Sequence, residues 1–293
     1  YVFASETCAF DAVGAEYVRD IKPGEMIVLE AGKEGMRTEQ LFSGKPRAIC
    51  AMEYIYFARP DSDIDSVNIH LARKRMGRQL AMESFVDADV VTGVPDSSIS
   101  AAIGFAEQTG IPYELGLIKN RYTGRTFIEP SKELREQGVK MKLSAVRKVV
   151  EGKRVVMIDD SIVRGTTSLR IVKLLREAGA TEVHVRISSP PFQNPCFYGI
   201  DTPTRKELIA SQKSVEDIRR AIQADSLYFL SHKGLLESIG RGTAEEFNRG
   251  LCTACFDHHY PTELYGGLTQ QESLQDHDHP VQSRKYTAEP ARP

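Results

Sequence analysis

Two adjacent aspartates at the end of an apolar run are the residues best suited to chemistry in this chain. Asp159 and Asp160 follow the run Val155–Ile158, which is typical of a strand buried on both faces. Paired carboxylates suit ribose hydroxyls, or a Mg²⁺ ion that also holds a pyrophosphate. The loop that follows supplies hydroxyl groups, a basic side chain and a glycine, which together can hold a phosphate. These residues are Ser161, Arg164, Gly165, Thr166, Thr167 and Ser168.

The elements around these residues predict a βαβ unit. An amphipathic helix follows the loop and stops at Ala178-Gly179, and the run Glu182–Ile187 then alternates in the period of a strand. In such a unit the ligand lies beyond the carboxyl end of the strand, where the free amides of the next helix favour a phosphate. The plainer alternative is that the two acids only cap that helix.

A second turn of the same kind is expected after residues 89–94, a short strand that ends in Pro95-Asp96-Ser97-Ser98. Residues 99–110 are predicted to be helical, with Ser97 or Ser98 as the N-cap. If both turns lie at the carboxyl edge of one parallel sheet, they face the same crevice. A plain capped helix is the alternative.

Residues 119–143 form a long polar segment rich in Lys and Arg and interrupted by glycine and proline. Such segments are often lids or binding loops, and basic side chains suit a polyphosphate. Closure would keep water from a reactive sugar. The alternative is a surface excursion that binds no ligand.

Composition narrows the class of protein. A chain of 293 residues can bury a sizeable core, and its formal net charge of −2 gives no electrostatic case for binding nucleic acid or an anionic membrane. No apolar run approaches the roughly 20 residues of a membrane span, and no secretory signal opens the chain. A cytoplasmic location is expected. Five cysteines then favour metal binding or catalysis over disulfides.

The remaining elements are predicted from local patterns. We expect short strands over residues 1–29, a connecting loop over 32–45, a β-prone run over 48–57 and a long helix over 67–83. Ser214 and Asp217 indicate a capping box that opens a helix to about Gln223. The basic residues of the long helix are expected on a solvated outer face, and they are Arg73, Lys74, Arg75 and Arg78.

The strand and loop at Asp159 resemble the PRPP-binding signature of the type I phosphoribosyltransferases. Over residues 5–265 the chain closely resembles the amidophosphoribosyltransferase family, which opens purine synthesis, in its iron–sulfur branch. The matching strings are CAMEYIYFARPDS from Cys50, GVPDSSISAAIG from Gly93, KNRYTGRTFIEPS from Lys119, VVMIDDSIVRGTTS from Val155, SSPPFQNPCFYGID from Ser188 and CTACFDHHYPTELY from Cys252.

The resemblance implies a fold, a reaction and two cofactors. The fold would be a type I phosphoribosyltransferase, a parallel sheet flanked by helices, after a remnant of an α+β N-terminal nucleophile glutaminase domain. Ammonia derived from glutamine would displace pyrophosphate from PRPP to give 5-phosphoribosylamine. The reaction would depend on positioning and on Mg²⁺, without a single catalytic residue. Mg²⁺ would sit at Ser97, Asp159 and Asp160, PRPP on the loop 161–168 with Lys119 and Arg121, and a 4Fe-4S cluster on Cys50, Cys196, Cys252 and Cys255.

The same resemblance implies the domain boundaries and partners. Residues 1–30 would be the end of the glutaminase domain, 31–265 the phosphoribosyltransferase domain with the iron–sulfur site, and 266–293 a disordered tail. The glutaminase nucleophile would be missing, so this truncated enzyme would use ammonia alone. Purine nucleotides are expected as feedback inhibitors, and the chain as a homo-oligomer, either dimer or tetramer. His258 departs from the family, where glycine is expected after the CxxC pair.

Three other functions compete with this interpretation. A salvage phosphoribosyltransferase that uses a nucleobase would have no reason to carry the four cysteines. A nucleotide-sensing regulator built on the PRPP fold would need a helix-turn-helix and a basic face, and the sequence indicates neither. A non-catalytic iron–sulfur protein would leave the two acids and the phosphate loop unexplained.

Overall fold

The computed structural model describes residues 1–33, 35–42, 47–120, 143–202, 204–240 and 250–264. The chain divides into two compact units, residues 1–261 and 262–293, and only residues 262–264 of the second are described. Arg121 and the tail expected over 266–293 therefore lie outside the described residues, as does most of the expected lid. In the described part, no helix has both the length and the apolar character needed to cross a membrane.

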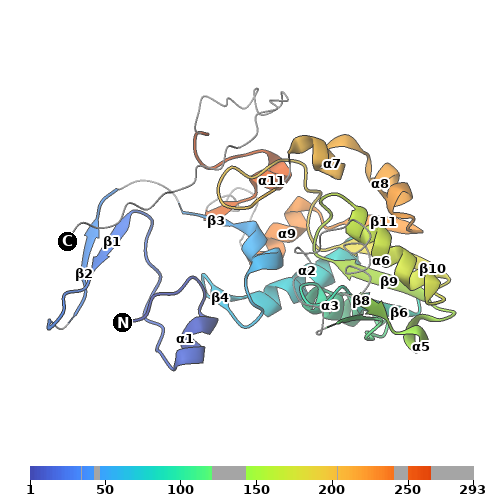
Figure 1. Ribbon diagram of the computed structural model, residues 1–293, viewed down its shortest axis with the longest axis horizontal. Coiled ribbons are helices and arrows are strands. Elements are labelled where there is room, and N and C mark those ends of the chain that lie inside the picture. Colours follow the sequence, from blue (N-terminus) through green and yellow to red (C-terminus); the bar gives the residue numbers. More distant parts are fainter. Residues whose placement is uncertain (34, 43–46, 121–142, 203, 241–249, 265–293) are drawn as a thin grey trace, which may run out of the picture. The chain divides into compact units, whose positions relative to one another are not determined.

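A four-stranded parallel sheet lies in the right-hand part of the larger unit as drawn in Figure 1. Each strand except the first is separated from the one before it by at least one helix, so parallel pairing needs the helical crossovers that the sequence predicts. The expected βαβ unit is confirmed, because β9 pairs in parallel with β10 and α6 connects them. The strands in spatial order are β11 (Ser226–Phe229), β10 (Glu182–Ile187), β9 (Arg154–Asp159) and β6 (Val90–Gly93).

Helices cover both faces of this sheet, so its central strands are apolar on both sides. Val156 and Ile158 of β9 join one core, whereas Val155 and Met157 join the other. The first core includes side chains of α2 (Ile69–Glu83), α3 (Ile99–Thr109) and α9 (His232–Ile239). The second includes side chains of α6 (Thr166–Glu177) and α8 (Val215–Ile222).

Helices α2 and α3 cross at very short range because both carry glycine at the crossing. A Cβ atom on Gly77 would lie 1.9 Å from the carbonyl oxygen of Ala101, and one on Gly104 would lie 1.9 Å from that of Lys74. No side chain fits at either position. The crossing holds α3, and with it the loop that carries Ser97 and Ser98, against the sheet.

Smaller elements complete the unit. Two antiparallel hairpins are formed by β4 (Asp63–Ile64) with β5 (Val67–Asn68), and by β7 (Leu117–Lys119) with β8 (Leu143–Ala145). A parallel pair joins β3 (Ala48–Cys50) to β12 (Gly250–Cys252), two segments far apart in the sequence. Short helical turns are α5 (Arg147–Val150), η3 (Arg205–Glu207), α7 (Ile209–Gln212) and α11 (Ala254–Asp257).

The expectation of strands over residues 1–29, followed by a loop, is wrong in part. Residues Cys8–Val13 form a helix, α1, which ends at Gly14 in the left-handed conformation that glycine adopts most readily. The expected loop instead holds β2 (Arg37–Gln40), which pairs antiparallel with β1 (Glu25–Val28). This strand is mostly exposed and polar, so its sequence lacks the apolar alternation of a half-buried strand.

The β-prone run over 48–57 is also only partly a strand. After β3 the chain enters a π-helical turn, η1 (Glu53–Phe57). Arg73, expected on a solvated face, is instead 3% exposed and donates to the carbonyl oxygens of Tyr54 (2.9 Å) and Ala58 (2.8 Å). The turn thus takes its hydrogen bonds from a distant arginine, which local sequence patterns do not reveal.

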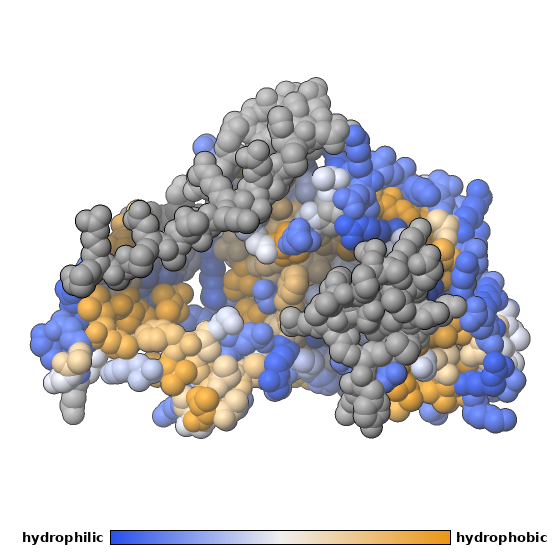
Figure 2. Space-filling view, viewed as in Figure 1, coloured by the Kyte–Doolittle hydropathy of each residue, from blue (hydrophilic) through white to orange (hydrophobic). Residues whose placement is uncertain are grey.

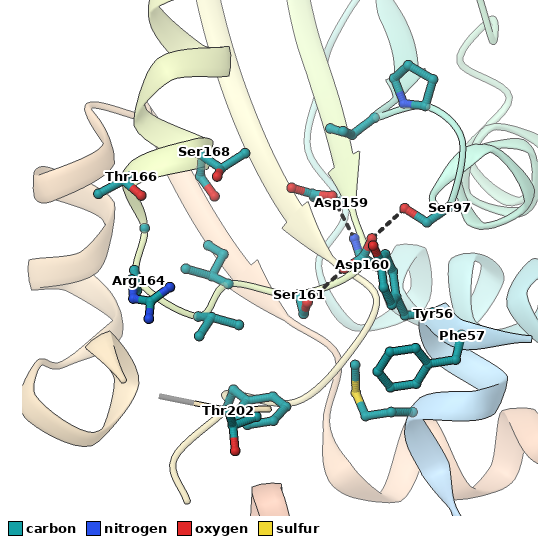
Figure 3. Close-up of a pocket in the computed structure, with 18 of the residues that line it drawn as sticks. Tyr56, Phe57, Ser97, Asp159, Asp160, Ser161, Arg164, Thr166, Ser168 and Thr202 are labelled. Carbon is teal, nitrogen blue, oxygen red and sulfur yellow. Dashed lines mark hydrogen bonds between the residues drawn. The ribbon is translucent and has the colours of Figure 1, made fainter. Parts of the chain in front are cut away.

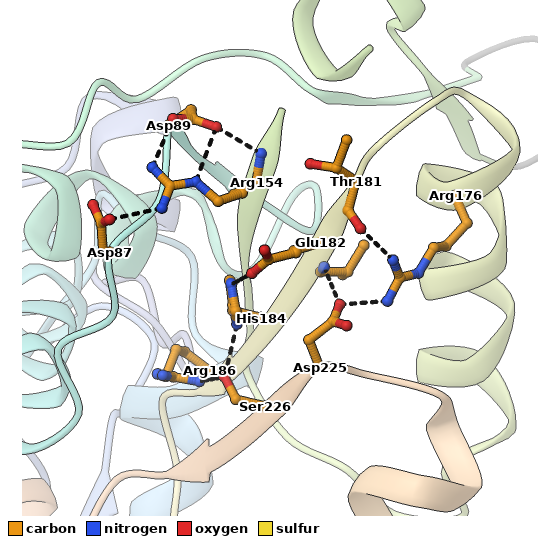
Figure 4. Close-up of polar contacts among 11 residues, drawn as sticks. Asp87, Asp89, Arg154, Arg176, Thr181, Glu182, His184, Arg186, Asp225 and Ser226 are labelled. Carbon is orange, nitrogen blue, oxygen red and sulfur yellow. Dashed lines mark hydrogen bonds and ion pairs between the residues drawn. The ribbon is translucent and has the colours of Figure 1, made fainter. Parts of the chain in front are cut away.

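Ion pairs tie together the amino-terminal edge of the sheet, opposite the aspartates (Figure 4). Arg154 pairs with Asp87 at 2.6 Å and with Asp89 at 3.0 Å, and the pKa of Asp89 is lowered to about 2 by the guanidinium. Arg176 of α6 pairs with Asp225, which also accepts from the amide of Val183. These contacts lie where the strands begin, and they leave the carboxyl edge open.

The end of the unit that carries α1, β1 and β2 exposes large apolar side chains, visible as orange surface in Figure 2. Helix α1 buries only Cys8. This region therefore has no substantial core of its own among the described residues. The exposed apolar residues here include Tyr1, Val2, Phe3, Val13, Tyr17, Val18, Leu41 and Phe42.

Candidate functional site

The two aspartates lie at the carboxyl tip of β9 and meet the second predicted turn (Figure 3). Ser97 donates a hydrogen bond to the carboxylate of Asp160, and Ser98 donates to that of Asp159 at 3.2 Å. Ser98 is the N-cap of α3, yet its side chain caps no amide, because it serves the aspartate instead. The expectation that both turns face one crevice is confirmed by these contacts.

Both carboxylates are almost fully buried, with Asp159 at 7% and Asp160 at 8% exposure. Burial raises the pKa of Asp159 well above its usual range, and the neighbouring charge of Asp160 raises it further. Burial also raises the pKa of Asp160, while hydrogen bonds from Ser97 and Ser161 and the charge of Arg73 oppose that rise. Two adjacent buried carboxylates thus favour any cation or hydroxyl donor that relieves their charge.

The loop after Asp160 is shaped to hold an anion. Gly165 has a φ of 78°, a left-handed conformation, and it is the N-cap of α6, which begins with Thr166 and Thr167. No side chain caps the helix, so its first amides face the loop. Ser168 is buried in the first turn of α6. Free amides and hydroxyls at a helix amino terminus form a suitable phosphate site.

A cavity of about 930 Å³ joins the aspartates to this loop. Its lining contains every residue from Asp159 to Ser168, together with Ser97 and Lys119. Lys119 pairs with Asp96 at 2.8 Å, and Arg121 lies outside the described residues. The structure therefore brings together all the described residues that the sequence indicates for PRPP and Mg²⁺.

The apolar wall of this cavity is missing from the sequence prediction. Tyr56 and Phe57 of η1 stand beside Asp160 with their rings 5.2 Å apart and nearly perpendicular. Phe192 and the segment 200–202 complete the wall. These residues lie far from the aspartates in the sequence and carry no charge, so only their place in the fold reveals them.

Four cysteines lie near one another, and none of them lines this cavity. Cys50 and Cys252 are register partners on β3 and β12, and Cys255 follows in α11. Cys196 lies in the loop between β10 and η3, close enough to contribute to the raised pKa values of the other three thiols. Burial raises the pKa of Cys50 to about 11 and raises that of Cys252, and the neighbouring thiols add to both effects.

The geometry of the cysteine site is set by backbone contacts. The amides of Gln193 and Asn194 both donate to the carbonyl oxygen of Cys255, which fixes the Cys196 loop against α11. All five cysteines are free thiols. Across the described ranges, no three His, Cys, Asp or Glu side chains are arranged to hold one metal ion. Cys8 is buried in α1, apart from this set.

The backbone conformation of His258 explains why glycine is expected at its position. It has a φ of 66° at the carboxyl end of α11, in the left-handed region that glycine adopts at least cost. Its ring nitrogen Nδ1 lies 3.1 Å from the side-chain oxygen of Asn194. The imidazole thus adds a link to the Cys196 loop that a glycine lacks.

Comparisons with known proteins show what the chain resembles. The phosphoribosyl transferase domain family matches residues 63–188. The amidophosphoribosyltransferase of Bacillus subtilis (strain 168) is 69% identical over 265 residues, covering 90% of this chain and 55% of that protein. Its counterpart in Staphylococcus aureus (strain Mu50) is 55% identical and covers 90% of this chain and 53% of that protein.

Solved structures agree with the sequence comparisons. A structure described as the allosteric regulatory enzyme of purine biosynthesis superposes with a TM-score of 0.83 at 66% identity, covering 93% of this chain and 58% of that one. The structure of the B. subtilis glutamine PRPP amidotransferase complexed with ADP and GMP also has a TM-score of 0.83 and 66% identity, and the match covers 92% of this chain and 59% of that one. The chain spans about half the length of the curated relatives it matches. It is therefore homologous to the amidophosphoribosyltransferases over their phosphoribosyltransferase domain, and its fold is that of a type I phosphoribosyltransferase.

Proposed function

We propose that this chain catalyses the phosphoribosyl transfer of an amidophosphoribosyltransferase, the first step of purine synthesis. PRPP and ammonia would give 5-phosphoribosylamine and pyrophosphate. The observation that carries the proposal is the single cavity in which two buried aspartates face a phosphate-type loop. The 69% identity to the B. subtilis relative supports the same reaction, and it disfavours a non-catalytic nucleotide sensor.

The residues of the cavity suggest how the reaction proceeds. The amides and hydroxyls of residues 161–168 would hold the 5′-phosphate of PRPP, and Lys119, which lines the cavity, would lie near the pyrophosphate. The nitrogen of ammonia forms a bond to ribose C1 while the bond from C1 to the pyrophosphate oxygen breaks, with inversion at C1. Pyrophosphate leaves with the electron pair, and a proton passes from nitrogen to solvent. Positioning therefore contributes more than a general base.

The aspartates fit a Mg²⁺ site. Asp159 and Asp160 are hard oxygen donors, their raised pKa values show unrelieved negative charge, and the Ser97 hydroxyl is bonded to Asp160. When bound, Mg²⁺ would neutralise charge that develops on the leaving pyrophosphate. The two carboxylates would also accept hydrogen bonds from ribose hydroxyls, which fixes the orientation of C1.

The cysteine site fits a 4Fe-4S cluster. Four buried or half-buried free thiols lie close enough to raise one another's pKa, and thiolates are the ligands that iron–sulfur clusters take. Each thiolate of such a cluster binds a different iron, so the four do not need to converge on one ion, as they would for zinc. We therefore assign the cluster to Cys50, Cys196, Cys252 and Cys255.

Further parts of the proposal concern organisation and regulation. Residues 1–30 would belong to a glutaminase domain, which would account for the apolar side chains exposed there, and 31–265 would form the phosphoribosyltransferase domain. Purine nucleotides would inhibit, as the relative solved with ADP and GMP suggests, and the protein would be a cytoplasmic homo-oligomer, either dimer or tetramer.

Pyrophosphate release from PRPP tests the proposed reaction. The 293-residue chain should turn over with ammonia at raised pH and should show no activity with glutamine. The reason is that Cys8 is buried at the start of α1 and the other cysteines are the proposed cluster ligands. Asp159→Asn and Asp160→Asn should keep the fold and lose most of the turnover. Absence of ammonia-dependent turnover in well-folded protein would refute the proposal.

A further inference from the structure

The side chain of Arg164 is held by a residue outside the cavity. Its Nε and Nη2 atoms lie 2.8 and 2.7 Å from Oε2 of Glu207, in the short helical turn η3. Glu207 is not part of the cavity lining, whereas Arg164 is. In Figure 3, Arg164 lies well apart from Asp160, on the side of the loop that leads into α6. The one arginine of the phosphate loop is thus already engaged by a carboxylate.

The same segment supports the loop at two further points. The amide of Ile209, the first residue of α7, donates to the carbonyl oxygen of Val163 at 2.9 Å. A Cβ on Gly165 would lie 2.9 Å from the Cδ1 atom of Ile209, so the loop packs closely on that side chain. Leu208, between the two contacts, is fully buried. Three consecutive loop residues therefore rest on η3 and α7.

We propose that Glu207 is a positioning residue for the phosphate loop, and that the Arg164 side chain is the loop's anchor rather than a phosphate ligand. The inference rests on the proposed function, because it assigns a role within that PRPP site. The loop binds anions through amides whose directions are fixed by the backbone of residues 161–166. The ion pair keeps that backbone in place from outside, and the phosphate meets only main-chain and hydroxyl groups.

The competing interpretation makes a different prediction. If the Arg164 guanidinium binds the phosphate directly, replacing Arg164 should weaken PRPP binding far more than replacing Glu207. Loss of Glu207 would even release the guanidinium toward the ligand and strengthen binding. An anchor behaves otherwise, since both partners act through one contact and either loss has the same consequence.

A double-mutant cycle separates the two interpretations. The variants are Arg164→Gln, Glu207→Gln, the double variant and the charge-swapped pair Arg164→Glu with Glu207→Arg. Glu237→Gln is the matched control, because Glu237 is similarly exposed and pairs with Lys233 on α9. PRPP affinity is measured by calorimetry in the presence of Mg²⁺, and kcat with ammonia is measured alongside.

An exposed ion pair is worth a modest amount, so each single variant should raise the Kd for PRPP about 2- to 5-fold. The double variant should be no worse than either single, kcat should stay unchanged, and the swapped pair should recover most of the affinity. A loss above about tenfold for Arg164→Gln alone, or additive effects, would overturn the anchor and leave the proposed function standing. If the unsubstituted chain binds no PRPP, the proposed function fails and the inference fails with it.

Discussion

Replacing Asp159 by asparagine should stabilise the ligand-free protein while it removes PRPP-dependent turnover. The Asp159 carboxylate is 7% exposed, adjacent to the equally buried Asp160, and no arginine or lysine pairs with it among the described residues. Within the described part of the chain, this carboxylate accepts only from Ser98 and from the amide of Asp160. Asparagine keeps an oxygen for these donors and removes the buried charge. The expected gain is about 1 to 3 kcal/mol, or about 3 to 10 °C in Tm.

The gain should depend on pH in a defined direction. The pKa of Asp159 is raised on folding by burial and by Asp160, so the folded state binds its proton more tightly than the unfolded state. The loss of folding stability caused by the Asp159 carboxyl group is therefore absent below the unfolded-state pKa of about 4, and it grows as the pH rises toward the folded-state pKa. Asparagine does not titrate. The difference in Tm should be present at pH 7.5 and should vanish near pH 4.

Thermal unfolding followed by circular dichroism, without Mg²⁺ or PRPP, measures this difference. Asp11→Asn is a suitable control because Asp11 is an exposed aspartate of α1. It should leave the Tm within about 1 °C at both pH values. A lower Tm for Asp159→Asn at pH 7.5 would refute the reasoning, since it would mean that the folded protein compensates the charge without a ligand.

Three further substitutions test other parts of the structure. Gly77→Ala should lower the unfolding free energy by at least about 2 kcal/mol, because its Cβ would meet the carbonyl oxygen of Ala101. Leu71→Ala, at an exposed position on the same helix, should cost little. Denaturant unfolding of both variants measures the difference. Anaerobically purified protein should be brown and contain about four irons per chain. Cys252→Ser should abolish both properties, and Cys8→Ser should leave both intact. Stoichiometric zinc without sulfide would refute the cluster. Ser97→Ala should weaken PRPP binding about 3- to 10-fold, through its lost hydrogen bond to Asp160, and unchanged affinity would contradict that role.

The parallel sheet and its loops could be predicted because their signals are local. The apolar run before Asp159 and the helical period after Ser168 each specify one element, and the structure confirms both. The sharing of one crevice by the Ser97 and Asp159 turns followed from the rule that parallel strands end at the same edge. Ser214 is the N-cap of α8 and accepts from the amide of Asp217, as its capping box predicts.

Features that depend on distant contacts could not be predicted in this way. Arg73 sits in a basic helical sequence, yet it is buried because the carbonyl groups of η1 require donors. The aromatic wall of the cavity depends on where that turn packs, against α2 and β3. The Arg164–Glu207 pair joins residues 43 positions apart through a segment with no recognisable motif. In each case the partner, not the residue, determines the role.

A crystal structure of the chain with Mg²⁺ and PRPP tests the central claim most directly. The account predicts the 5′-phosphate against the amides of residues 161–168, with the ribose and Mg²⁺ at Asp159 and Asp160. It also predicts that Arg164 stays on Glu207 in that complex. The structure describes another cavity, of about 880 Å³, which Glu6 and Glu53 line. PRPP bound there, with the Asp159 crevice unchanged, would contradict the assignment of the site.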